Sequence, residues 1–303
     1  MLFYLAPMEG ITGYIVRNAY AHYFPYIDKY FTPFIPTAKK MSKKIKRDLA
    51  AEHNEQIHLV PQLIGNRADE FLMMIHQLEE LGFTSVNLNF GCPSGTVVSK
   101  RKGAGFLEDP EELENLLEEV LEKSPLAVSV KTRVGMEDPD EWEALCAVYA
   151  KFPLEELIIH PRLQKDYYST PRMETFARAL EQIHVPLCYN GDICSVEDYE
   201  RVTATFPTVD RIMIGRGLLE NPGLVGEIKG NPPADKARLR AFHDEILEGC
   251  LDTFRAEKDV VFHLKEIWFY LTKSFPDREK YLKLIRKCQS LPEYKLIVQQ
   301  IFS

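Results

Sequence analysis

One of the six cysteines is placed where its thiol can take part in a reaction. Cys92 stands between Gly91 and Pro93, just after the apolar run 85–91, so we expect it in a loop. With its ordinary pKa of about 8.5, a thiol keeps its proton at neutral pH and can act as a general acid, or as a nucleophile once deprotonated. The remaining cysteines form no Cys-x-x-Cys pair and are expected as small buried side chains: Cys146, Cys188, Cys194, Cys250 and Cys288.

Candidate site residues also stand at the ends of the other apolar runs. Taken alone, each fits a structural or solvated residue. If the runs are parallel strands of a barrel, however, their carboxyl ends meet at one mouth, and the set predicts an active site there. The set consists of Pro7 and Met8, Gln62, Asn89, Lys131 and Arg133, His160 and Arg162, Asn190, Gly191 and Asp192, and Gly215, Arg216 and Gly217.

Two glycine-containing segments, 190–192 and 215–217, follow the last two runs. Loops in this part of a barrel often bind phosphate, because glycine lets backbone N–H groups approach an anion closely. Arg216 would add a positive charge, and the alternative is that these glycines only form turns. Lys131 can place a cation beneath a heterocyclic ring and stabilise negative charge on it.

The apolar runs alternate with amphipathic segments over the first three quarters of the chain. The strand-like runs span 2–8, 29–34, 58–65, 85–91, 126–135, 156–162, 185–192 and 210–217. Helical spacing is clearest over 66–82, 109–123, 139–152 and 195–206. This alternation predicts an α/β fold, a (β/α)8 TIM barrel, with a doubly wound sheet as the alternative.

The pattern changes at a proline-containing linker over 231–236. Only helical segments follow it, at 241–254, 263–275, 279–288 and, less clearly, 292–302. We therefore expect a barrel domain over residues 1–232 and a small helical bundle over residues 233–303.

The composition is that of an ordinary globular protein, with 303 residues, 45% hydrophobic and 27% charged. It excludes a largely disordered or coiled-coil chain. No apolar stretch is long enough for a membrane span, and the N-terminus lacks the features of a signal peptide, so we expect a cytoplasmic protein. No residue set has metal-ligand spacing, so no metal is expected, and a monomer is the default expectation.

The net charge of −8 argues mildly against a nucleic-acid partner, but basic residues gather in two runs. The run 39–47 contains Lys43, Lys44 and Lys46, and the run 100–102 begins with Lys100 and Arg101. Both would lie on the rim of the predicted mouth, where a local positive field can bind RNA phosphates. The alternative is that they are solvated helix faces.

Seven motifs share their order and spacing with one enzyme family. They are APMEGIT (6–12), PQLIGN (61–66), NLNFGCP (87–93), SVKTR (129–133), HPR (160–162), NGDI (190–193) and IGRGLLENP (214–222). The chain resembles the dihydrouridine synthases, flavin enzymes that reduce uridine in RNA. The resemblance covers essentially the whole barrel. The helical tail resembles the RNA-binding domain of the family more loosely, best at HLKEIWFYL (263–271).

The resemblance implies a mechanism in which NADPH, a transient reductant, passes a hydride to FMN, and reduced FMN passes one to C6 of uracil. Cys92 matches the catalytic cysteine that protonates C5. The resemblance implies FMN contacts for Ala6, Pro7, Met8, Gln62, Asn89, Lys131, His160, Asn190, Gly191, Asp192, Gly215 and Arg216. We assign the RNA side to Arg133, Arg162, Tyr168, Lys43, Lys44, Lys46, Lys100 and Arg101.

The sequence departs from the family pattern at a few positions. Gly13 stands where the family often has Asp, and Leu163, Asp166 and Thr170 stand where Thr, Gln and Gly are usual. These positions lie toward the substrate, so they bear on the RNA target more than on the cofactor. Transfer RNA is the expected substrate, and ribosomal RNA is the alternative to it. Two more candidate functions are an FMN-dependent small-molecule ene or pyrimidine reductase and a non-catalytic RNA-binding protein.

Overall fold

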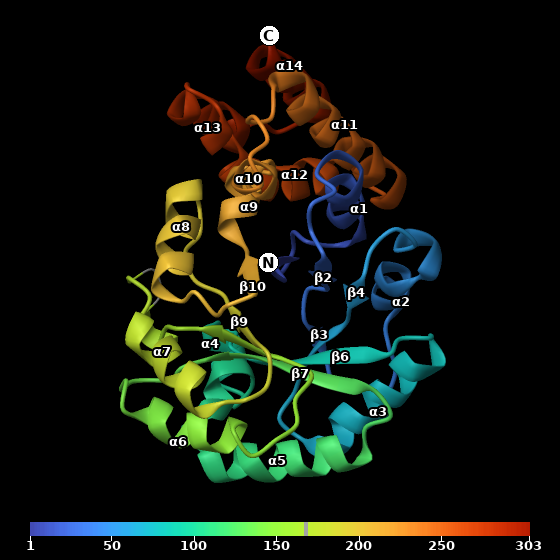
Figure 1. The fold of residues 1–303 in the computed structure, drawn as a ribbon. Helices are drawn as coiled ribbons and strands as arrows, with labels where there is room; N and C mark the ends of the chain where they lie inside the picture. The colour runs from blue at the N-terminus through green and yellow to red at the C-terminus, as the bar shows by residue number, and fades with distance from the viewer. Residues whose placement is uncertain (167–168) are drawn as a thin grey trace.

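The computed structural model describes residues 1–166 and 169–303, and its strands form one curled, parallel sheet (Figure 1). The strands are β1 (Leu2–Leu5), β2 (Lys29–Phe31), β3 (Ile35–Pro36), β4 (Leu59–Val60), β5 (Gln62–Ile64), β6 (Ser85–Phe90), β7 (Ala127–Arg133), β8 (Leu157–His160), β9 (Leu187–Tyr189) and β10 (Arg211–Ile214). Their order is β3-β5-β6-β7-β8-β9-β10-β1-β2-β4. The predicted α/β barrel is confirmed.

The predicted strand over 58–65 is divided into β4 and β5, and the predicted strand over 29–34 ends early as β2 and is followed by the separate β3, which is why the sheet has ten strands. Residues 32–34 separate β2 from β3, and Pro61 separates β4 from β5. Proline has no N–H group to donate, so it breaks the ladder. Because β2 pairs with β4 and β3 with β5, the two ends of the strand order are joined through the chain, and the sheet curls toward closure.

Helices cover the outside of the sheet. Those of the barrel are α1 (Tyr14–Tyr23), α2 (Lys43–Leu49), α3 (Ala68–Glu80), α4 (Gly95–Val98), α5 (Pro110–Lys123), α6 (Glu141–Tyr149), α7 (Met173–Gln182), α8 (Val196–Thr205), α9 (Arg216–Glu220) and α10 (Leu224–Ile228). Short 3-10 turns lie at Ala51–His53, Gly103–Glu108 and Gln164–Asp166. The residues at the start of α5 show why a helix begins there. The Asp109 side chain caps the helix by accepting from the Glu112 N–H at 3.0 Å, and Pro110 is its first residue.

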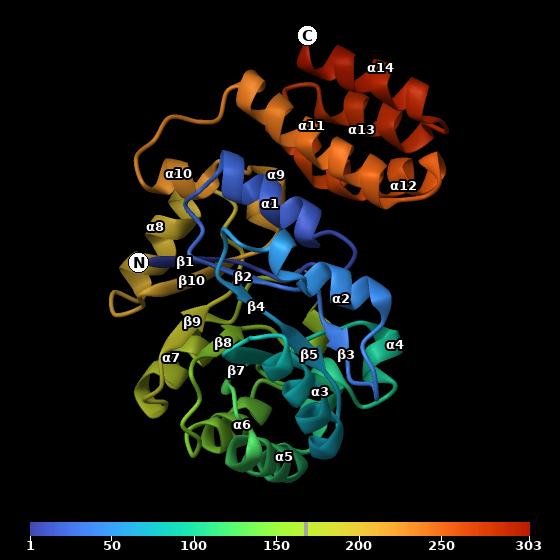
Figure 2. The same cartoon turned by 90° about the vertical axis from the view of Figure 1, so that its right-hand side faces the viewer.

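The chain ends in a bundle of α11 (Lys236–Thr253), α12 (Glu257–Leu271), α13 (Arg278–Lys287) and α14 (Leu291–Phe302), with a 3-10 turn at Thr272–Ser274. Figure 2 shows these helices together beside α1 and α9 of the barrel. Gly249 of α11 lies so close to Ile15 that a Cβ would come within 2.7 Å of the Ile15 side chain. The hydroxyl groups of Tyr14 and Thr253 are 2.6 Å apart, so the bundle is tied to the first barrel helix by packing and by a hydrogen bond.

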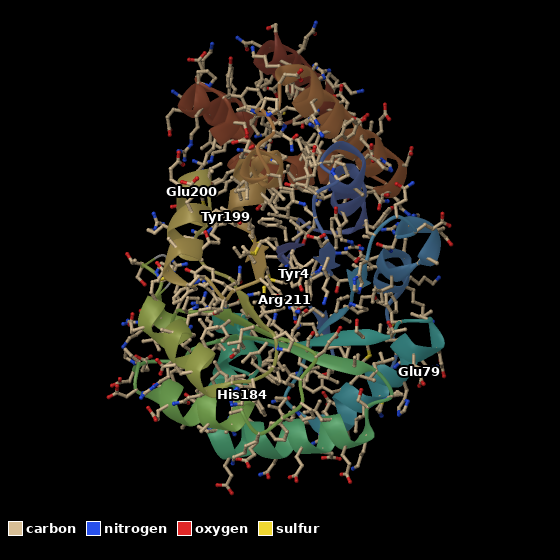
Figure 3. All side chains as sticks on the ribbon, in the orientation of Figure 1. Tyr4, Glu79, His184, Tyr199, Glu200 and Arg211 are labelled. Carbon is tan, nitrogen blue, oxygen red and sulfur yellow. The ribbon has the colours of Figure 1, made fainter. Side chains whose placement is uncertain are left out.

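The amino-terminal end of the barrel interior holds a buried ionic cluster. Glu156 accepts a hydrogen bond from the Tyr4 hydroxyl at 2.9 Å and one from Lys29 Nζ at 2.8 Å. Arg211, labelled with Tyr4 in Figure 3, lies 3.9 Å from the same carboxylate. Burial, followed by the charge of Glu156, raises the pKa of Tyr4 far above its ordinary value. This cluster occupies the amino-terminal end of the barrel interior, whereas the predicted site residues stand at the carboxyl ends of the strands.

Within residues 1–166 and 169–303, no helix combines the length and the apolar character that a membrane crossing requires.

Candidate active site

The Cys92 loop connects β6 with α4 and is held from two sides. On one side, the Asn89 side-chain oxygen accepts from the N–H groups of Gly91 and Cys92, both at 2.9 Å. On the other, the Ala104 N–H donates to the Cys92 carbonyl at 3.0 Å, and a Cβ on Gly103 would lie 2.8 Å from that oxygen. The thiol is partly buried, and this burial raises the pKa of Cys92. The side chain therefore carries its proton at neutral pH.

Polar side chains on the inner face of β5, β6 and β7 form hydrogen bonds with one another. Gln62 of β5 donates to Asn87 of β6 at 2.8 Å, and Asn87 donates to Ser129 of β7 at 2.9 Å. Asn89 donates to Gln62 at 2.7 Å, and Lys131 is its partner in the strand register. Burial and then the charge of Arg133 lower the pKa of Lys131 to about 8. A cation is therefore held close to the mouth in a poorly solvated position.

A second polar group follows β8 and β9. Arg162 is fully buried and donates to Asp192 at 2.9 Å and to His160 at 3.0 Å, while Arg216 also binds Asp192. Burial, together with the charges of Lys131 and three arginines, lowers the pKa of His160 well below its ordinary value, so this ring is neutral at pH 7. Burial would raise the pKa of Asp192, but its two arginine partners outweigh that effect and lower it. The result is a hydrogen-bonded cluster with a net positive charge.

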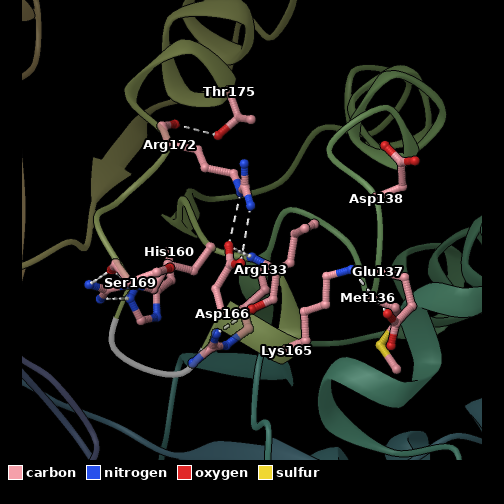
Figure 4. A network of polar contacts seen from close by, with 12 residues as sticks. Arg133, Met136, Glu137, Asp138, His160, Lys165, Asp166, Ser169, Arg172 and Thr175 are labelled. Atoms are coloured by element: carbon pink, nitrogen blue, oxygen red, sulfur yellow. Dashed lines mark hydrogen bonds and ion pairs between the residues drawn. The ribbon is translucent and has the colours of Figure 1, made fainter.

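Arg133 ties the segment after β8 to the Cys92 loop, and Figure 4 shows the ion pair of Asp166 and Arg172 in this segment. Arg133 donates to the Gly91 carbonyl at 3.0 Å and to the Leu163 carbonyl at 2.7 Å, so it joins the two loops. Asp166 accepts from the Leu163 N–H and from Arg172, both at 2.9 Å. The family departures at Leu163 and Asp166 thus belong to one hydrogen-bonded turn. Tyr168 lies outside the described residues.

Glycines bring the loops after β9 and β10 close together. A Cβ on Gly191 would lie 2.4 Å from the Tyr189 hydroxyl, and one on Gly217 would lie 2.0 Å from the Ile193 carbonyl. A Cβ on Gly215 would touch Ala6 and Met8 at 3.4 and 3.5 Å. The strand-end residues of β1, among them Pro7, therefore lie beside the predicted phosphate loops. Asn190 donates to the Met213 carbonyl at 2.9 Å and fixes β9 to β10.

The basic run around Lys43, Lys44 and Lys46 forms α2, and these three side chains are exposed. The buried Arg17 anchors the helix by donating to the Asp48 carbonyl at 2.9 Å. The charge of Lys44 lowers the pKa of Glu9, and the charge of Glu9 raises the pKa of Cys92. The amino-terminal part of α2 therefore lies near the mouth.

Two of the arginines that we predicted on the RNA side have partners within the protein. Lys100 is exposed, whereas Arg101 forms an ion pair with Glu112 at 2.5 Å. Arg162, which we predicted on the RNA side, directs its donors to His160, Asp192 and the Ser169 carbonyl. In this arrangement Arg162 supports the cluster from behind, and its contact with RNA stays a prediction.

Comparison with known proteins identifies the family. The family model described as dihydrouridine synthase (Dus) matches residues 4–300. The chain belongs to the dihydrouridine synthase family. It is 30% identical over 301 residues to the protein named tRNA-dihydrouridine(16) synthase of Pseudomonas syringae pv. tomato, covering 93% of each chain. It is 26% identical over 311 residues to the protein of the same name in Neisseria meningitidis serogroup A, covering 97% of this chain and 92% of that one.

Solved structures show a similar fold at low sequence identity. Morphinone reductase in complex with tetrahydroNAD superposes with a TM-score of 0.55 over 77% of this chain and 88% of that one, at 12% identity. A variant of NCR from Zymomonas mobilis gives a TM-score of 0.53 at 12% identity, over 79% of this chain and 90% of that one. At such identity, the likeness shows the fold alone.

The predicted resemblance to dihydrouridine synthases is thus confirmed, while the roles of the individual site residues stay predictions. Sequence reasoning missed Asn87 and Ser129, which connect the predicted residues Gln62 and Asn89 to the barrel wall. Their signal was present: Asn87 and Asn89 are two residues apart in β6 with Leu88 between them, and Ser129 and Lys131 are two residues apart in β7 with Val130 between them. Such spacing puts both members of a pair on one face of a strand.

In the described parts of the chain, no cluster of three or more His, Cys, Asp or Glu side chains could hold a metal ion.

Proposed function

We propose that this protein reduces a uridine of transfer RNA to 5,6-dihydrouridine, with FMN as its bound cofactor and NADPH as the transient reductant. The observation that carries the proposal is the partly exposed Cys92 at the same barrel mouth as Lys131 and the cationic cluster of Arg162 and Arg216. Family membership supports uridine as the substrate. The relatives' names point to position 16 of the tRNA.

The residues at the mouth fit a flat, anionic cofactor. Arg216 and the closely packed loops at Gly191 and Gly215 would hold the phosphate of FMN, and Lys131 would place its charge against the ring. The neutral His160 accepts a hydrogen bond from Arg162 at 3.0 Å, and the charge of Lys131 also acts on it. A flavin bound there supplies the hydride that reduces C6 of the uracil.

Cys92 would then deliver the proton to C5. Burial raises its pKa, so the thiol is present as the acid before the reaction. The charges of Arg133 and Lys131 act in the opposite direction, and they stabilise the thiolate that proton transfer leaves behind. One group can therefore hold the proton at rest and release it when negative charge develops on the base.

The RNA would approach over the rim that carries α2. A base in a stack cannot reach the barrel mouth, so the target uridine must leave its stack. Unstacking costs a few kcal/mol, and a nucleotide in a loop largely avoids this cost.

We propose that residues 1–232 form the catalytic domain and residues 233–303 an RNA-binding domain. We also propose that the protein works as a monomer in the cytoplasm, where tRNA is processed. The exposed lysines of α2 support RNA binding through attraction to its phosphates.

The test is a reconstitution with purified protein, FMN, NADPH and unmodified tRNA, read by nucleoside mass spectrometry. We expect dihydrouridine with the native protein and none with Cys92→Ala, while the flavin absorption of that variant is unchanged. Cys194→Ala is the matched control, because Cys194 is also partly exposed but lies after β9. No dihydrouridine with the native protein, or full activity of Cys92→Ala, would contradict the proposal.

A further inference from the structure

The polar side chains behind Cys92 form a chain of hydrogen bonds that runs in one direction. The Cys92 N–H donates to Asn89 at 2.9 Å, Asn89 donates to Gln62 at 2.7 Å, and Gln62 donates to Asn87 at 2.8 Å. Asn87 donates to the Ser129 hydroxyl at 2.9 Å, and Ser129 donates to the Val86 carbonyl at 3.2 Å. Every hydrogen bond therefore points the same way, from the Cys92 N–H toward the Val86 carbonyl. We call Ser129, Asn87, Gln62 and Asn89 the amide relay.

The amide relay lies inside the barrel and is shielded from water. All four side chains are buried, and Gln62 and Asn87 are fully so. Asn87 faces Gln62 and Ser129 in the strand register, which places these side chains in one layer. Asn89 lies one layer nearer the mouth on the same face of β6. Hydrogen bonds in such surroundings strengthen one another, and a missing link leaves a buried polar group unpaired.

The direction of the chain fixes how each amide is turned. Reversal of the Asn89 or Gln62 amide would set N–H against N–H at one end and oxygen against oxygen at the other, and reversal of the Asn87 amide would set its N–H group against that of Gln62. Asn89 therefore turns its oxygen to the N–H groups of Gly91 and Cys92, and that oxygen holds both. Because one of its amide hydrogens is also used, Asn89 can meet a bound molecule only as a donor. It fits a carbonyl oxygen or an imine nitrogen of a ring in the mouth.

We propose that Asn87 and Ser129 are positioning residues for Cys92, acting through Gln62 and Asn89. This inference rests on the proposed function for its effect on turnover. The Cys92 thiol must lie on one face of the bound base, and displacement of a reacting group by about 1 Å can lower a rate about 100-fold. The amide relay sets the orientation of Asn89, and Asn89 sets the backbone that carries the thiol.

The test compares Asn87→Leu and Ser129→Ala with the native holoenzyme in two assays. The first measures alkylation of Cys92 by iodoacetamide, followed by peptide mass spectrometry, and needs neither tRNA nor reductant. We expect Asn87→Leu to be alkylated at least about fivefold faster, since a loosened loop exposes the thiol and relieves the burial that raises its pKa. The second measures dihydrouridine formation, where we expect kcat to fall about 10- to 100-fold with KM for tRNA unchanged.

Ser129→Ala removes only the outer link, so it serves as the milder variant if Asn87→Leu fails to fold. We expect a smaller change in the same direction in both assays. The matched control is Thr132→Val, which also removes a buried hydroxyl of β7, one that accepts from Tyr149 at 2.9 Å on the outer face of the strand. It should lower the melting temperature and leave Cys92 alkylation unchanged.

Alkylation and kcat within about twofold of native for both relay variants would overturn the inference, since reactivity at a displaced thiol must change. If the native protein forms no dihydrouridine at all, the proposed function fails. The alkylation rates then still decide whether the amide relay positions Cys92.

Discussion

Replacement of Lys131 by methionine is expected to stabilise the protein while it removes activity. Burial and the charge of Arg133 lower the pKa of Lys131 from 10.5 to about 8. At about 1.4 kcal/mol per pH unit, holding this charge reduces the free energy of unfolding by at most about 3 kcal/mol at pH 7. Methionine has a similar length and carries no charge, so it relieves this penalty. Stability lost to a poorly solvated charge is a common feature of functional sites.

The stability cost of the Lys131 charge depends on pH. Between the folded pKa of about 8 and the unfolded value of 10.5, the unfolded chain binds more protons, so the stability of the native protein rises with pH across this window. The advantage of Lys131→Met should therefore fall from about 3 kcal/mol at pH 7 to about 1 kcal/mol at pH 9.5.

Urea unfolding of flavin-free protein at the two pH values measures this advantage. Lys151→Met is the control, since Lys151 is an exposed lysine that pairs with Glu114 at 2.6 Å. Its loss should change stability by less than about 1 kcal/mol at either pH. A variant at position 131 that is less stable than native at pH 7, or whose advantage is equal at both pH values, would show that the charge of Lys131 carries no such penalty.

Two further predictions concern the barrel interior and the rim. Glu156→Gln should lower the free energy of unfolding by about 3–5 kcal/mol, because it removes the nearer carboxylate of the buried Lys29 and leaves only Glu155, at 3.9 Å. Urea unfolding measures this loss, and a loss below about 1 kcal/mol would show that the cluster at the amino-terminal end is not a buried ion pair. The triple change of Lys43, Lys44 and Lys46 to Glu should weaken tRNA binding and leave the flavin absorption unchanged. Binding measured at several salt concentrations should also show a shallower salt dependence, whereas unchanged affinity at low salt would count against a role for α2.

The sequence predicts the framework of this fold because the framework depends on local patterns. Apolar runs became strands, and Asp109 before Pro110 marked the start of α5. Cys92 was predicted in a loop because glycine before it and proline after it fit neither a helix nor a strand. The prolines that divide two of the strands were visible, but their effect on strand count depends on which strands pair.

The features that the sequence did not predict depend on partners far away in the chain. Glu156 meets Tyr4 across 152 residues, and Asn87 meets Ser129 across 42. Arg162 stands at a strand end and binds Asp192 because β8 and β9 bring the two together, while its predicted contact with RNA stays a prediction. Periodicity shows which face a side chain takes, while the register between strands decides its partner.

The proposed reduction of uridine in tRNA is best tested in cells. Transfer RNA from cells with and without the gene would be digested and its dihydrouridine mapped by mass spectrometry. We expect dihydrouridine at position 16, the position in the names of the relatives, to disappear without the gene. It should return with the native gene and fail to return with Cys92→Ala. Unchanged dihydrouridine at every position of every tRNA in cells without the gene would contradict the proposed reaction.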